Sequence, residues 1–443
     1  MIKRALLLAA LLASPLSAQT HPADEVSAER LRSDVEKLVS FGTRHTLSSQ
    51  TDPERGIGAA VDWGLAEFKR IGAKCGGCLE VLPVSDTITA APRIPTPTLV
   101  RNAVAIQRGT ERPKEVVIVQ GHIDSRVSEA LDFTSDAPGA NDDGSGTALV
   151  LEAARALSGE TYPSTIIYAL LSGEEQGLHG GRILADWAEA QGFTVKAVLN
   201  NDIVGNSCGK DGYCEPKVVR VFSEGPRADL TDRLRAAQTR FGGENDTPSR
   251  NLSRWVAGLA AEQPDAMQVR QIWRTDRMGR GGDQVPFLQK GYPAIRFSVG
   301  VEDYDHQHQD LRTEDGVFYG DTVDEMDFAY LAGVTQLNVR ALDALARAPM
   351  PPKVTVDAAV RVDTEVKWQT VAGAEAYRLI KRRSDAPAWG GDEVIMVAAP
   401  TSTKVMPYRG DDWIFGVAAC DGNYCSPVSS AVPGGAFEPV AKE

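Results

Sequence analysis

The chain has 443 residues, 42% of them hydrophobic, and a formal net charge of -13 at pH 7. This length and apolar content can fill a large core, so they predict a folded protein of two domains and exclude a mainly disordered chain. The acidic balance argues against nucleic acid and anionic membranes as partners, because both carry negative charge themselves.

The first eighteen residues have the pattern of a secretory signal. Lys3 and Arg4 precede an apolar run from Ala5 to Ala13, and small residues follow up to Ala18. We expect cleavage near Ala18, which removes two basic residues and no acidic one and so changes the formal charge from -13 to -15. The apolar run is too short to span a bilayer and no similar run follows, so we predict an exported protein, periplasmic or extracellular, that does not bind membranes.

Segments with helical periodicity then alternate with short apolar runs typical of buried strands. In chain order we expect a helix at 24–40, a helix at 57–71, strands at 78–88, 99–107 and 116–119, a helix at 146–157, a strand at 165–171, a helix at 181–191, strands at 195–199 and 218–223, a helix at 229–241, a strand at 294–298 and a helix at 325–346. The alternation predicts an α/β fold with a mixed, mostly parallel central sheet and helices on both faces, beginning with antiparallel strands. Arg44 and His45 fall between the first two helices, in a polar segment that we interpret as a surface loop, although both side chains could approach a site.

The composition changes at Ala348-Pro-Met-Pro-Pro-Lys. From Val354 onward, short alternating segments separated by turn residues predict a small all-β sandwich. We therefore divide the chain into a signal at 1–18, a first domain at 19–349 and a second at 350–443. The segments AYRLIKRR and FGVAACDGNYCSPVSSAV resemble a fibronectin type III domain, a module that binds or spaces; contact with substrate or with a cell surface, or a role in stability, all stay open for it.

Six cysteines form three pairs that are close in sequence, Cys75 with Cys78, Cys208 with Cys214, and Cys420 with Cys425. In an exported chain, close pairs of even number predict local disulfides. Zinc bound by these thiols is the alternative, but the pairs lie too far apart in sequence to nominate one four-thiolate site.

Acidic or imidazole side chains follow three of the predicted buried strands, and the carboxyl ends of parallel strands meet at one edge of a sheet. These side chains are His122, Asp124, Glu174, Glu175 and Asp202. Asp142 lies in a Gly/Ser-rich turn after the first of these strands, and His306 and His308 follow a later strand. Imidazole and carboxylate are zinc-type ligands, and this inventory suits two divalent ions that share a carboxylate.

The motifs HIDSR, GANDDGSG, SGEEQG, NND and DHQHQD, in that order, resemble the co-catalytic di-zinc aminopeptidase family. This family includes secreted bacterial leucyl-type aminopeptidases and, more distantly, glutamate carboxypeptidase II. The resemblance extends over roughly residues 24–347 and implies the zinc exopeptidase fold. It also implies two zinc ions as cofactors and a peptide with a free N-terminus as substrate.

The family pattern implies a role for each matching residue. Asp142 would bridge the two zinc ions, with His122 and Asp202 completing one and Glu175 and His306 the other. His306 is preferred because the family's last ligand stands four residues before an acidic residue, as His306 does before Asp310. His308, two residues before that acid, is the alternative.

The catalytic roles fall on two further acids. Glu174 would be the general base that takes a proton from a water held between the ions, and Asp124 would orient the imidazole of His122. The resemblance also implies a cis peptide bond between Asp142 and Asp143. A further donor to the oxyanion is left open among Arg277, Arg280 and Tyr304.

Three other functions remain as alternatives. A di-zinc carboxypeptidase or amide deacylase of the same fold often has DxKG where this chain has DDGSG, and carries a separate lid domain before the last ligand. Glutaminyl cyclases share the fold but use one zinc ion. A catalytically silent binding protein would have lost Glu174 or a ligand, and this chain has lost neither.

Overall fold

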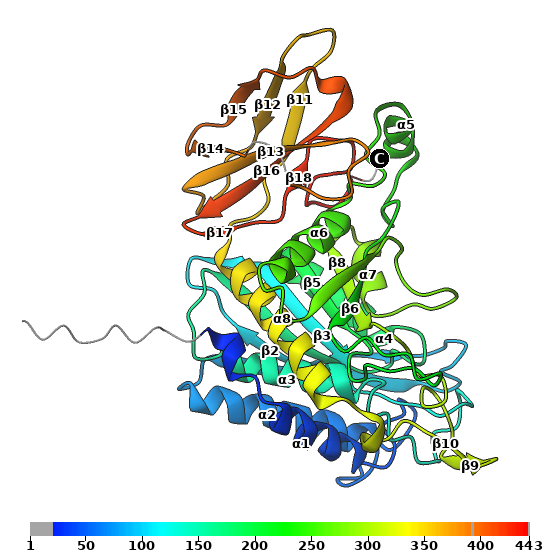
Figure 1. Ribbon diagram of the computed structural model, residues 1–443. Helices are drawn as coiled ribbons and strands as arrows, with labels where there is room; N and C mark the ends of the chain where they lie inside the picture. The colour runs from blue at the N-terminus through cyan, green and yellow to red at the C-terminus, as the bar shows by residue number, and fades with distance from the viewer. Residues whose placement is uncertain (1–20, 391–393, 442–443) are drawn as a thin grey trace, which may run out of the picture.

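The computed structural model describes residues 21–390 and 394–441, so the expected signal at 1–18 lies outside the described residues. A large central sheet lies between layers of helices, and a group of smaller sheets follows at the C-terminal end (Figure 1). Within the described residues, no helix is long and apolar enough to cross a membrane.

The helices are α1 (Ala28–Val39), α2 (Ile57–Lys74), α3 (Gly144–Leu157), α4 (His179–Ala190), α5 (Asp232–Phe241), α6 (Pro248–Ala261), α7 (Gln284–Gln289) and α8 (Phe328–Arg347), with short 3-10 turns at Pro22–Glu25, Val323–Glu325 and Gly410–Asp412. The strands up to α8 are β1 (Leu79–Ile88), β2 (Thr98–Gln107), β3 (Arg112–His122), β4 (Ser164–Leu171), β5 (Thr194–Asn201), β6 (Val218–Phe222), β7 (Gln268–Ile272), β8 (Ala294–Val299), β9 (Arg312–Glu314) and β10 (Val317–Tyr319). After α8 follow β11 (Val354–Asp357), β12 (Thr364–Trp368), β13 (Ala376–Arg383), β14 (Ile395–Ala398), β15 (Thr403–Met406), β16 (Trp413–Asp421), β17 (Tyr424–Cys425) and β18 (Ser429–Ser430).

The central sheet has the strand order β1-β2-β4-β3-β5-β8-β6-β7. Four of its seven pairings are parallel: β4 with β3, β3 with β5, β5 with β8, and β6 with β7. The first two strands pair antiparallel, as expected. The predicted fold class, a mixed and mostly parallel sheet covered by helices, is confirmed.

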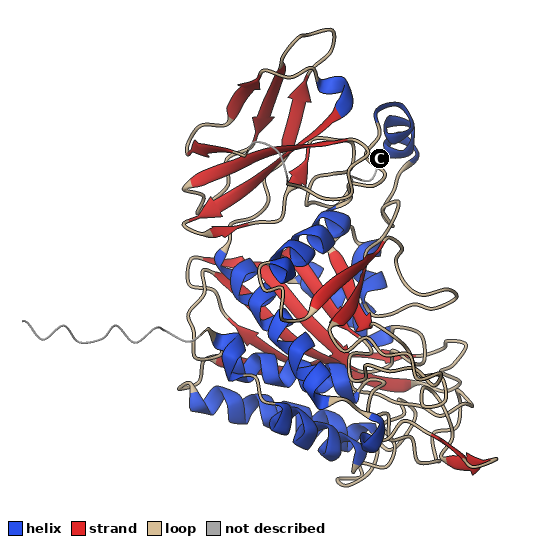
Figure 2. Cartoon of the chain, viewed as in Figure 1, coloured by secondary structure: helices blue, strands red, loops and turns tan. Residues whose placement is uncertain are grey.

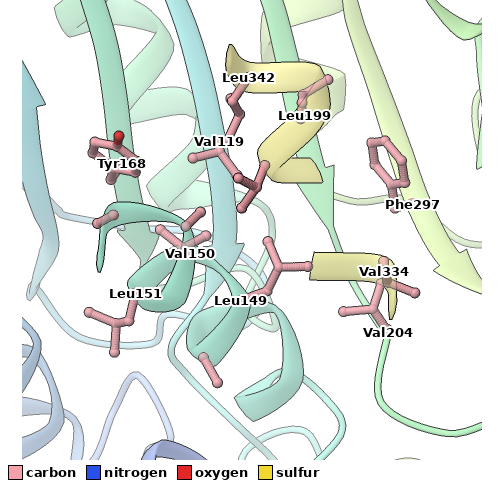
Figure 3. Close-up of a cluster of buried hydrophobic side chains, with 14 of the residues drawn as sticks. Val119, Leu149, Val150, Leu151, Tyr168, Leu199, Val204, Phe297, Val334 and Leu342 are labelled. Carbon is pink, nitrogen blue, oxygen red and sulfur yellow. The ribbon is translucent and has the colours of Figure 1, made fainter. Parts of the chain in front are cut away.

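Alternate residues of the central strands face opposite layers of helices. Val117 and Val119 of β3 belong to one buried cluster, together with residues of α1, α2, α3, α6 and α8. Val116 and Ile118 belong to a second cluster with residues of α4 and α7. Successive side chains of a strand point to opposite faces, so these continuous apolar runs require a cover on both sides. Figure 3 shows the first cluster, with β3 and α3 side chains meeting those of α8.

Side-chain caps fix where several helices begin. Ser27 before α1, Thr247 before α6 and Asp327 before α8 each accept a hydrogen bond from a backbone N–H of the first turn. These N–H groups have no partner inside the helix, so a capping oxygen stabilises the helix start by about 1 kcal/mol.

Several elements were not predicted from the sequence: α6, β7, α7 and the β9–β10 hairpin. The buried residues of α6 include polar ones such as Ser249, Arg250 and Asn251, which the apolar periodicity of a core helix does not include. Their partners lie partly in the chain beyond α8, so the burial of α6 is a tertiary effect.

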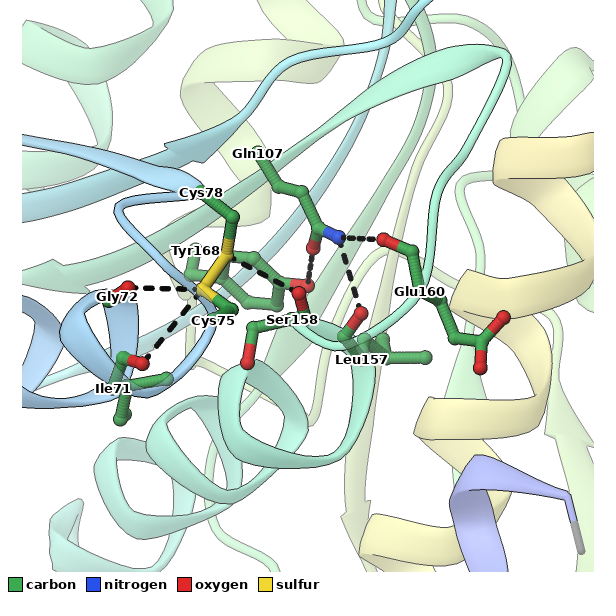
Figure 4. The surroundings of a disulfide bond; sticks show 9 residues. All are labelled: Ile71, Gly72, Cys75, Cys78, Gln107, Leu157, Ser158, Glu160 and Tyr168. Atoms are coloured by element: carbon green, nitrogen blue, oxygen red, sulfur yellow. Dashed lines mark hydrogen bonds between the residues drawn. A yellow bond between two sulfur atoms is a disulfide. The ribbon is translucent and has the colours of Figure 1, made fainter.

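The three predicted disulfides are all present, between Cys75 and Cys78, Cys208 and Cys214, and Cys420 and Cys425. The first closes the turn between α2 and β1, where Cys78 Sγ also lies 3.2 Å from the carbonyl oxygen of Ser158 after α3 (Figure 4). This contact brings the end of α2 next to the end of α3.

The chain after α8 forms antiparallel sheets, as the predicted all-β sandwich requires. One sheet has the order β11-β12-β15 and the other the order β14-β13-β16-β17, with β18 added to β16. Their facing side chains form a separate apolar cluster that includes Trp368, Tyr377, Leu379 and Val417. The resemblance to fibronectin type III and the domain boundaries stay predictions.

A buried ion pair joins these C-terminal sheets to α6. Both carboxylate oxygens of Asp246 lie 2.6 Å from Nη2 of Arg382 in β13, and both side chains are 2% exposed. Asp246 also accepts a hydrogen bond from Ser430 Oγ and lies 3.4 Å from Nη1 of Arg254. The C-terminal sheets are therefore fixed to the first part of the chain by desolvated charges, whose loss leaves unpaired cations in the interface.

We predict that Asp246→Ala lowers the free energy of unfolding by about 3–5 kcal/mol, because it leaves Arg382 and Arg254 buried without a carboxylate. Urea unfolding followed by circular dichroism measures this change. The matched control is Asp265→Ala, an exposed aspartate whose substitution should change stability by no more than about 0.5 kcal/mol. Equal stabilities of the two variants would contradict a structural role for the pair.

Candidate metal centre

The predicted acidic and imidazole side chains meet at the carboxyl ends of β3, β4 and β5. His122 is the last residue of β3 and stands opposite Leu171, the last residue of β4. Gln120 of β3 stands opposite Asn200 of β5, so Asp202 comes level with His122. Loops gather at this end of the sheet, near the β9–β10 hairpin and away from the C-terminal sheets (Figure 2).

Three side chains form a first group that can hold a metal ion: His122, Asp142 and Asp202. His122 Nε2 lies 3.1 Å from Asp142 Oδ1 and 3.9 Å from Asp202 Oδ2, and all three residues are buried. The other carboxylate oxygen of Asp202 lies 2.7 Å from Arg296 Nη2. The Asp142–Asp143 peptide bond is cis, as the resemblance implied.

A second group consists of Asp142, Glu175 and His308. His308 Nε2 lies 2.9 Å from Asp142 Oδ2 and 2.9 Å from Glu175 Oε1. Arg126 Nε donates a hydrogen bond of 2.8 Å to the other oxygen of Glu175. Asp142 thus belongs to both groups, with one oxygen directed to each.

His306, which the resemblance favoured as the last ligand, is not part of either group. Its Nδ1 lies 2.9 Å from the carbonyl oxygen of Gly320 and its Nε2 lies 3.3 Å from Glu325. The segment around His306 and His308 is a turn, and a φ of 55° at His308 directs the two imidazoles differently. The spacing to Asp310 cannot show this rotation. The structure brings His308, the alternative, and not His306 into a group that can hold a metal ion.

Asp124 contacts both the first strand end and the loop after β4. Its carbonyl oxygen lies 3.0 Å from His122 Nδ1, and its carboxylate Oδ1 lies 3.5 Å from the same nitrogen. The carboxylate also accepts hydrogen bonds from the backbone N–H groups of Glu174 and Glu175 and from Thr46 Oγ1. Asp124 can therefore orient His122 and also fix the turn that carries the two glutamates.

Asp143 has a structural role that the sequence analysis did not assign. Its Oδ1 accepts a hydrogen bond from Gly146 N at the start of α3, and its Oδ2 accepts one from the backbone N–H of His122. It therefore caps α3 and joins that helix to the end of β3. The run DDGSG before an apolar helix carries this signal, because aspartate is a preferred N-cap residue.

Asp321 was not predicted to take part in the site, and Arg44 was considered for it but expected on the surface. The carboxylate of Asp321 accepts hydrogen bonds of 2.7 Å from the backbone N–H groups of Asn141 and Asp142, and burial raises the pKa of Asp321 to about 7. Arg44, expected on the surface, is 1% exposed and donates to the carbonyl oxygens of Ile123 and Gly139. Neither residue stands in a recognisable motif, so only the folded chain shows that they hold the loop of Asp142.

Glu174 lines a cavity together with Asp142, Glu175 and Asp202. Its carboxylate also lies close enough to His122 and Glu175 for these three side chains to hold a metal ion. Burial, together with the charges of Asp202 and Glu175, raises the pKa of the Glu174 carboxyl well above its usual value. Burial acts in the same direction on Asp142, but the imidazoles of His308 and His122 outweigh it and hold the pKa of Asp142 well below its usual range. One carboxylate is thus suited to carry a proton and the other to remain ionised.

The donor set fits zinc. Two imidazole nitrogens and the oxygens of three carboxylates converge on two points, and zinc prefers this mixture of nitrogen and oxygen ligands. Glu175 Oε1 is buried and accepts no hydrogen bond among the described residues, and it faces His308 Nε2 at 2.9 Å, so both atoms are free to act as ligands of one cation. His308 Nε2 and Asp142 Oδ2 face the same point.

The cavity beside these groups has a volume of about 420 Å³. Besides the acids, it is lined by four arginines, Arg93, Arg126, Arg277 and Arg280. Of the three residues considered as oxyanion donors, Arg277 and Arg280 line this cavity, whereas Tyr304 lines a neighbouring one.

The model of peptidase family M28 matches residues 102–316. A "Probable zinc metalloprotease" of the fungus Leptosphaeria maculans is 44% identical over 398 residues, which cover 89% of this chain and 92% of the relative. A protein of the same description from Pyrenophora tritici-repentis is 42% identical, with 93% of this chain and 86% of the relative covered. The solved structure of the LapA aminopeptidase of Legionella pneumophila is similar in fold, with a TM-score of 0.53 and 19% identity over 73% of each chain.

The fold and the buried histidine–carboxylate cluster define a zinc-dependent peptidase. The chain belongs to peptidase family M28 and is a zinc metallopeptidase of that family.

Replacement of the two neighbouring histidines tests the assignment of the last metal-binding residue. We predict that His308→Ala weakens the binding of one zinc ion by more than ~100-fold, because it removes a direct ligand. The loss of a residue that only hydrogen-bonds to a ligand usually weakens metal binding by ~10–100-fold. His306→Ala, the matched control, should bind zinc as the wild type does. Metal-to-protein ratios after dialysis against buffered zinc measure both, and normal zinc content in His308→Ala would return the assignment to His306.

Proposed function

We propose that this metallopeptidase is an exported aminopeptidase that hydrolyses the N-terminal peptide bond of its substrates with two zinc ions. The observation that carries this proposal is the carboxylate of Asp142, which belongs to both metal-binding groups. One carboxylate shared by two groups is what a pair of ions about 3.5–4 Å apart requires.

Each site residue then has a role. His122 and Asp202 would hold one ion and Glu175 and His308 the other, with Asp142 between them. Zinc ions bound there would polarise the scissile carbonyl and lower the pKa of a water molecule. Glu174 would take the proton from that water and pass it to the leaving amine, which its raised pKa favours. Asp124 would hold His122 and the backbone of Glu174 in place.

The choice of an exopeptidase rests on the open cavity and on the chain between Asp202 and His308. In this interval β6, β7 and β8 extend the central sheet and α6 and α7 pack against it, whereas the short helix α5 lies beside the C-terminal sheets (Figure 1). The interval does not form the separate lid domain expected of the carboxypeptidase or deacylase alternative. LapA, which shares the fold, is described as an aminopeptidase.

Export is proposed from two observations. The pattern of residues 1–18 is that of a secretory signal. All six cysteines are paired in disulfides, which form and persist outside reducing compartments.

Paired substrates test the proposed activity. Leucine p-nitroanilide and an unblocked peptide should be hydrolysed, their N-acetylated forms should not, and amidation of the C-terminus should make little difference. Phenanthroline should abolish the activity and added zinc should restore it. Equal cleavage of acetylated and free substrates would contradict an aminopeptidase, and a requirement for a free C-terminal carboxylate would favour the carboxypeptidase alternative.

The general base is tested separately. We predict that Glu174→Gln lowers kcat by about a hundred- to ten-thousandfold, because the amide cannot accept a proton, while the zinc content stays at the wild-type value. Glu54→Gln, at an exposed glutamate, serves as the control with unchanged kcat. Near-normal turnover of Glu174→Gln would exclude this residue as the base.

A further inference from the structure

A second cavity of about 340 Å³ adjoins the metal centre. It shares Arg277 and Arg280 with the cavity that holds the metal-binding groups, so the two cavities adjoin at these side chains. We name it the side pocket. Its remaining lining residues are Arg220, Phe222, Ile272, Arg274, Met278, Glu302 and Tyr304.

The side pocket contains more positive than negative charge. Its one acid, Glu302, is buried and lies between two of its arginines, with Arg277 Nη1 at 2.9 Å and Arg220 Nη2 also in contact. Arg277 also contacts Asp276, and Arg220 donates to the carbonyl oxygen of Val299. These two arginines are therefore already paired.

Arg274 and Arg280 are different, because both are exposed and have donors to spare. The side chain of Arg274 has no hydrogen-bond or ion-pair partner among the described residues, and Arg280 donates only to Gln307 Oε1 at 3.3 Å. A guanidinium presents five donors in a planar fork that matches a carboxylate. The pocket thus offers two guanidinium groups with free donors in a cavity that adjoins the metal centre.

The rest of the wall is apolar. Phe222, Ile272 and Met278 line the pocket together with the ring of Tyr304. This surface can pack against the methylene groups of a short side chain whose charged end reaches the arginines. Phosphate or sulfate groups would use the forks but leave the apolar wall without a contact.

We propose that the side pocket binds a carboxylate of the peptide substrate through Arg274 and Arg280. The proposal rests on the proposed aminopeptidase function, since it places this carboxylate on a substrate whose scissile bond lies at the metal centre. The carboxylate belongs either to an aspartate or glutamate side chain or to the C-terminus of a short peptide, because the chemistry is the same. The pocket makes the enzyme selective for acidic or very short substrates.

Binding of peptide analogues to the zinc-loaded enzyme tests the proposal without turnover. Dipeptides in which CH2–NH replaces the scissile amide are not hydrolysed, and calorimetry gives their Kd. Three matched pairs of reduced dipeptides each differ by one carboxylate. The first pair is Leu-Glu-amide and Leu-Gln-amide, the second is Leu-Gln with a free C-terminus and Leu-Gln-amide, and the third is Glu-Leu-amide and Gln-Leu-amide. They separate a side chain after the bond, the C-terminus and a side chain before the bond.

In at least one pair, the carboxylate form should bind about tenfold more tightly, as expected for a charge-assisted hydrogen bond in a partly exposed pocket. The double variant Arg274→Gln/Arg280→Gln should lose this preference, and Arg274→Lys/Arg280→Lys should keep part of it. The control is Arg233→Gln, at an exposed arginine on α5, which should keep the full preference.

Two results would overturn the proposal: affinities within about twofold in all three pairs, or a preference that persists in the double glutamine variant. Hydrolysis of unmodified Leu-Gln-amide by the wild type is followed in parallel. Hydrolysis without a carboxylate preference rejects the side pocket but keeps the aminopeptidase. A carboxylate preference without hydrolysis of any free-amine peptide rejects the aminopeptidase but keeps the pocket.

Discussion

The site depends on the carboxylate of Asp142, which faces a different imidazole with each of its oxygens. His122 reaches it from the end of β3 and His308 from the loop before β9, at 3.1 and 2.9 Å. Buried carboxylates that face one another need cations or donors between them. The two imidazoles hold the pKa of Asp142 well below its usual range and so favour its ionised form. Two metal-binding groups therefore meet at one side chain, and any shift of its loop would disturb both.

That loop is held from three directions. Asp321 accepts both backbone N–H groups at Asn141 and Asp142, and Arg44 donates to the carbonyl oxygen of Gly139. The carboxylate of Asp143 accepts hydrogen bonds from the backbone N–H groups of Gly146 in α3 and of His122 at the end of β3, so it joins the loop to both elements. These contacts bring together parts of the chain up to 180 residues apart. The position of the shared carboxylate is thus set by buried polar contacts whose loss would leave charged groups unpaired.

The sequence predicts which side chains meet at the carboxyl ends of β3, β4 and β5, because two simple rules govern their positions. Continuous apolar runs such as Val116 to Val119 must be covered on both faces, and parallel strands bring their carboxyl ends to one edge. The register of β3 with β4 and β5 then places His122, Glu174 and Asp202 together. The turn at His308 follows neither rule, because its backbone conformation depends on local contacts, and counting residues to Asp310 therefore selected His306. Helix α6 was missed for a related reason. Its polar residues are buried by contacts distant in sequence: Arg250 donates to Ser223 after β6, and Asn251 donates to Ser430 of the C-terminal sheets.

The net charge of the chain does not predict the charge of the side chains around the metal centre. The chain carries a formal charge of -13, yet the walls around the metal centre and the side pocket contain six arginines: Arg93, Arg126, Arg220, Arg274, Arg277 and Arg280. Asp142 and Glu175 of the centre face His122, His308 and Arg126, so part of their negative charge is compensated within the centre. A substrate approaching the cavity meets mainly guanidinium groups, and short-range contacts decide recognition because salt screens distant charges within about 10 Å. The acidic surface elsewhere therefore acts on solubility, while the arginines with free donors, Arg274 and Arg280, are the groups through which we propose that the enzyme selects its substrates.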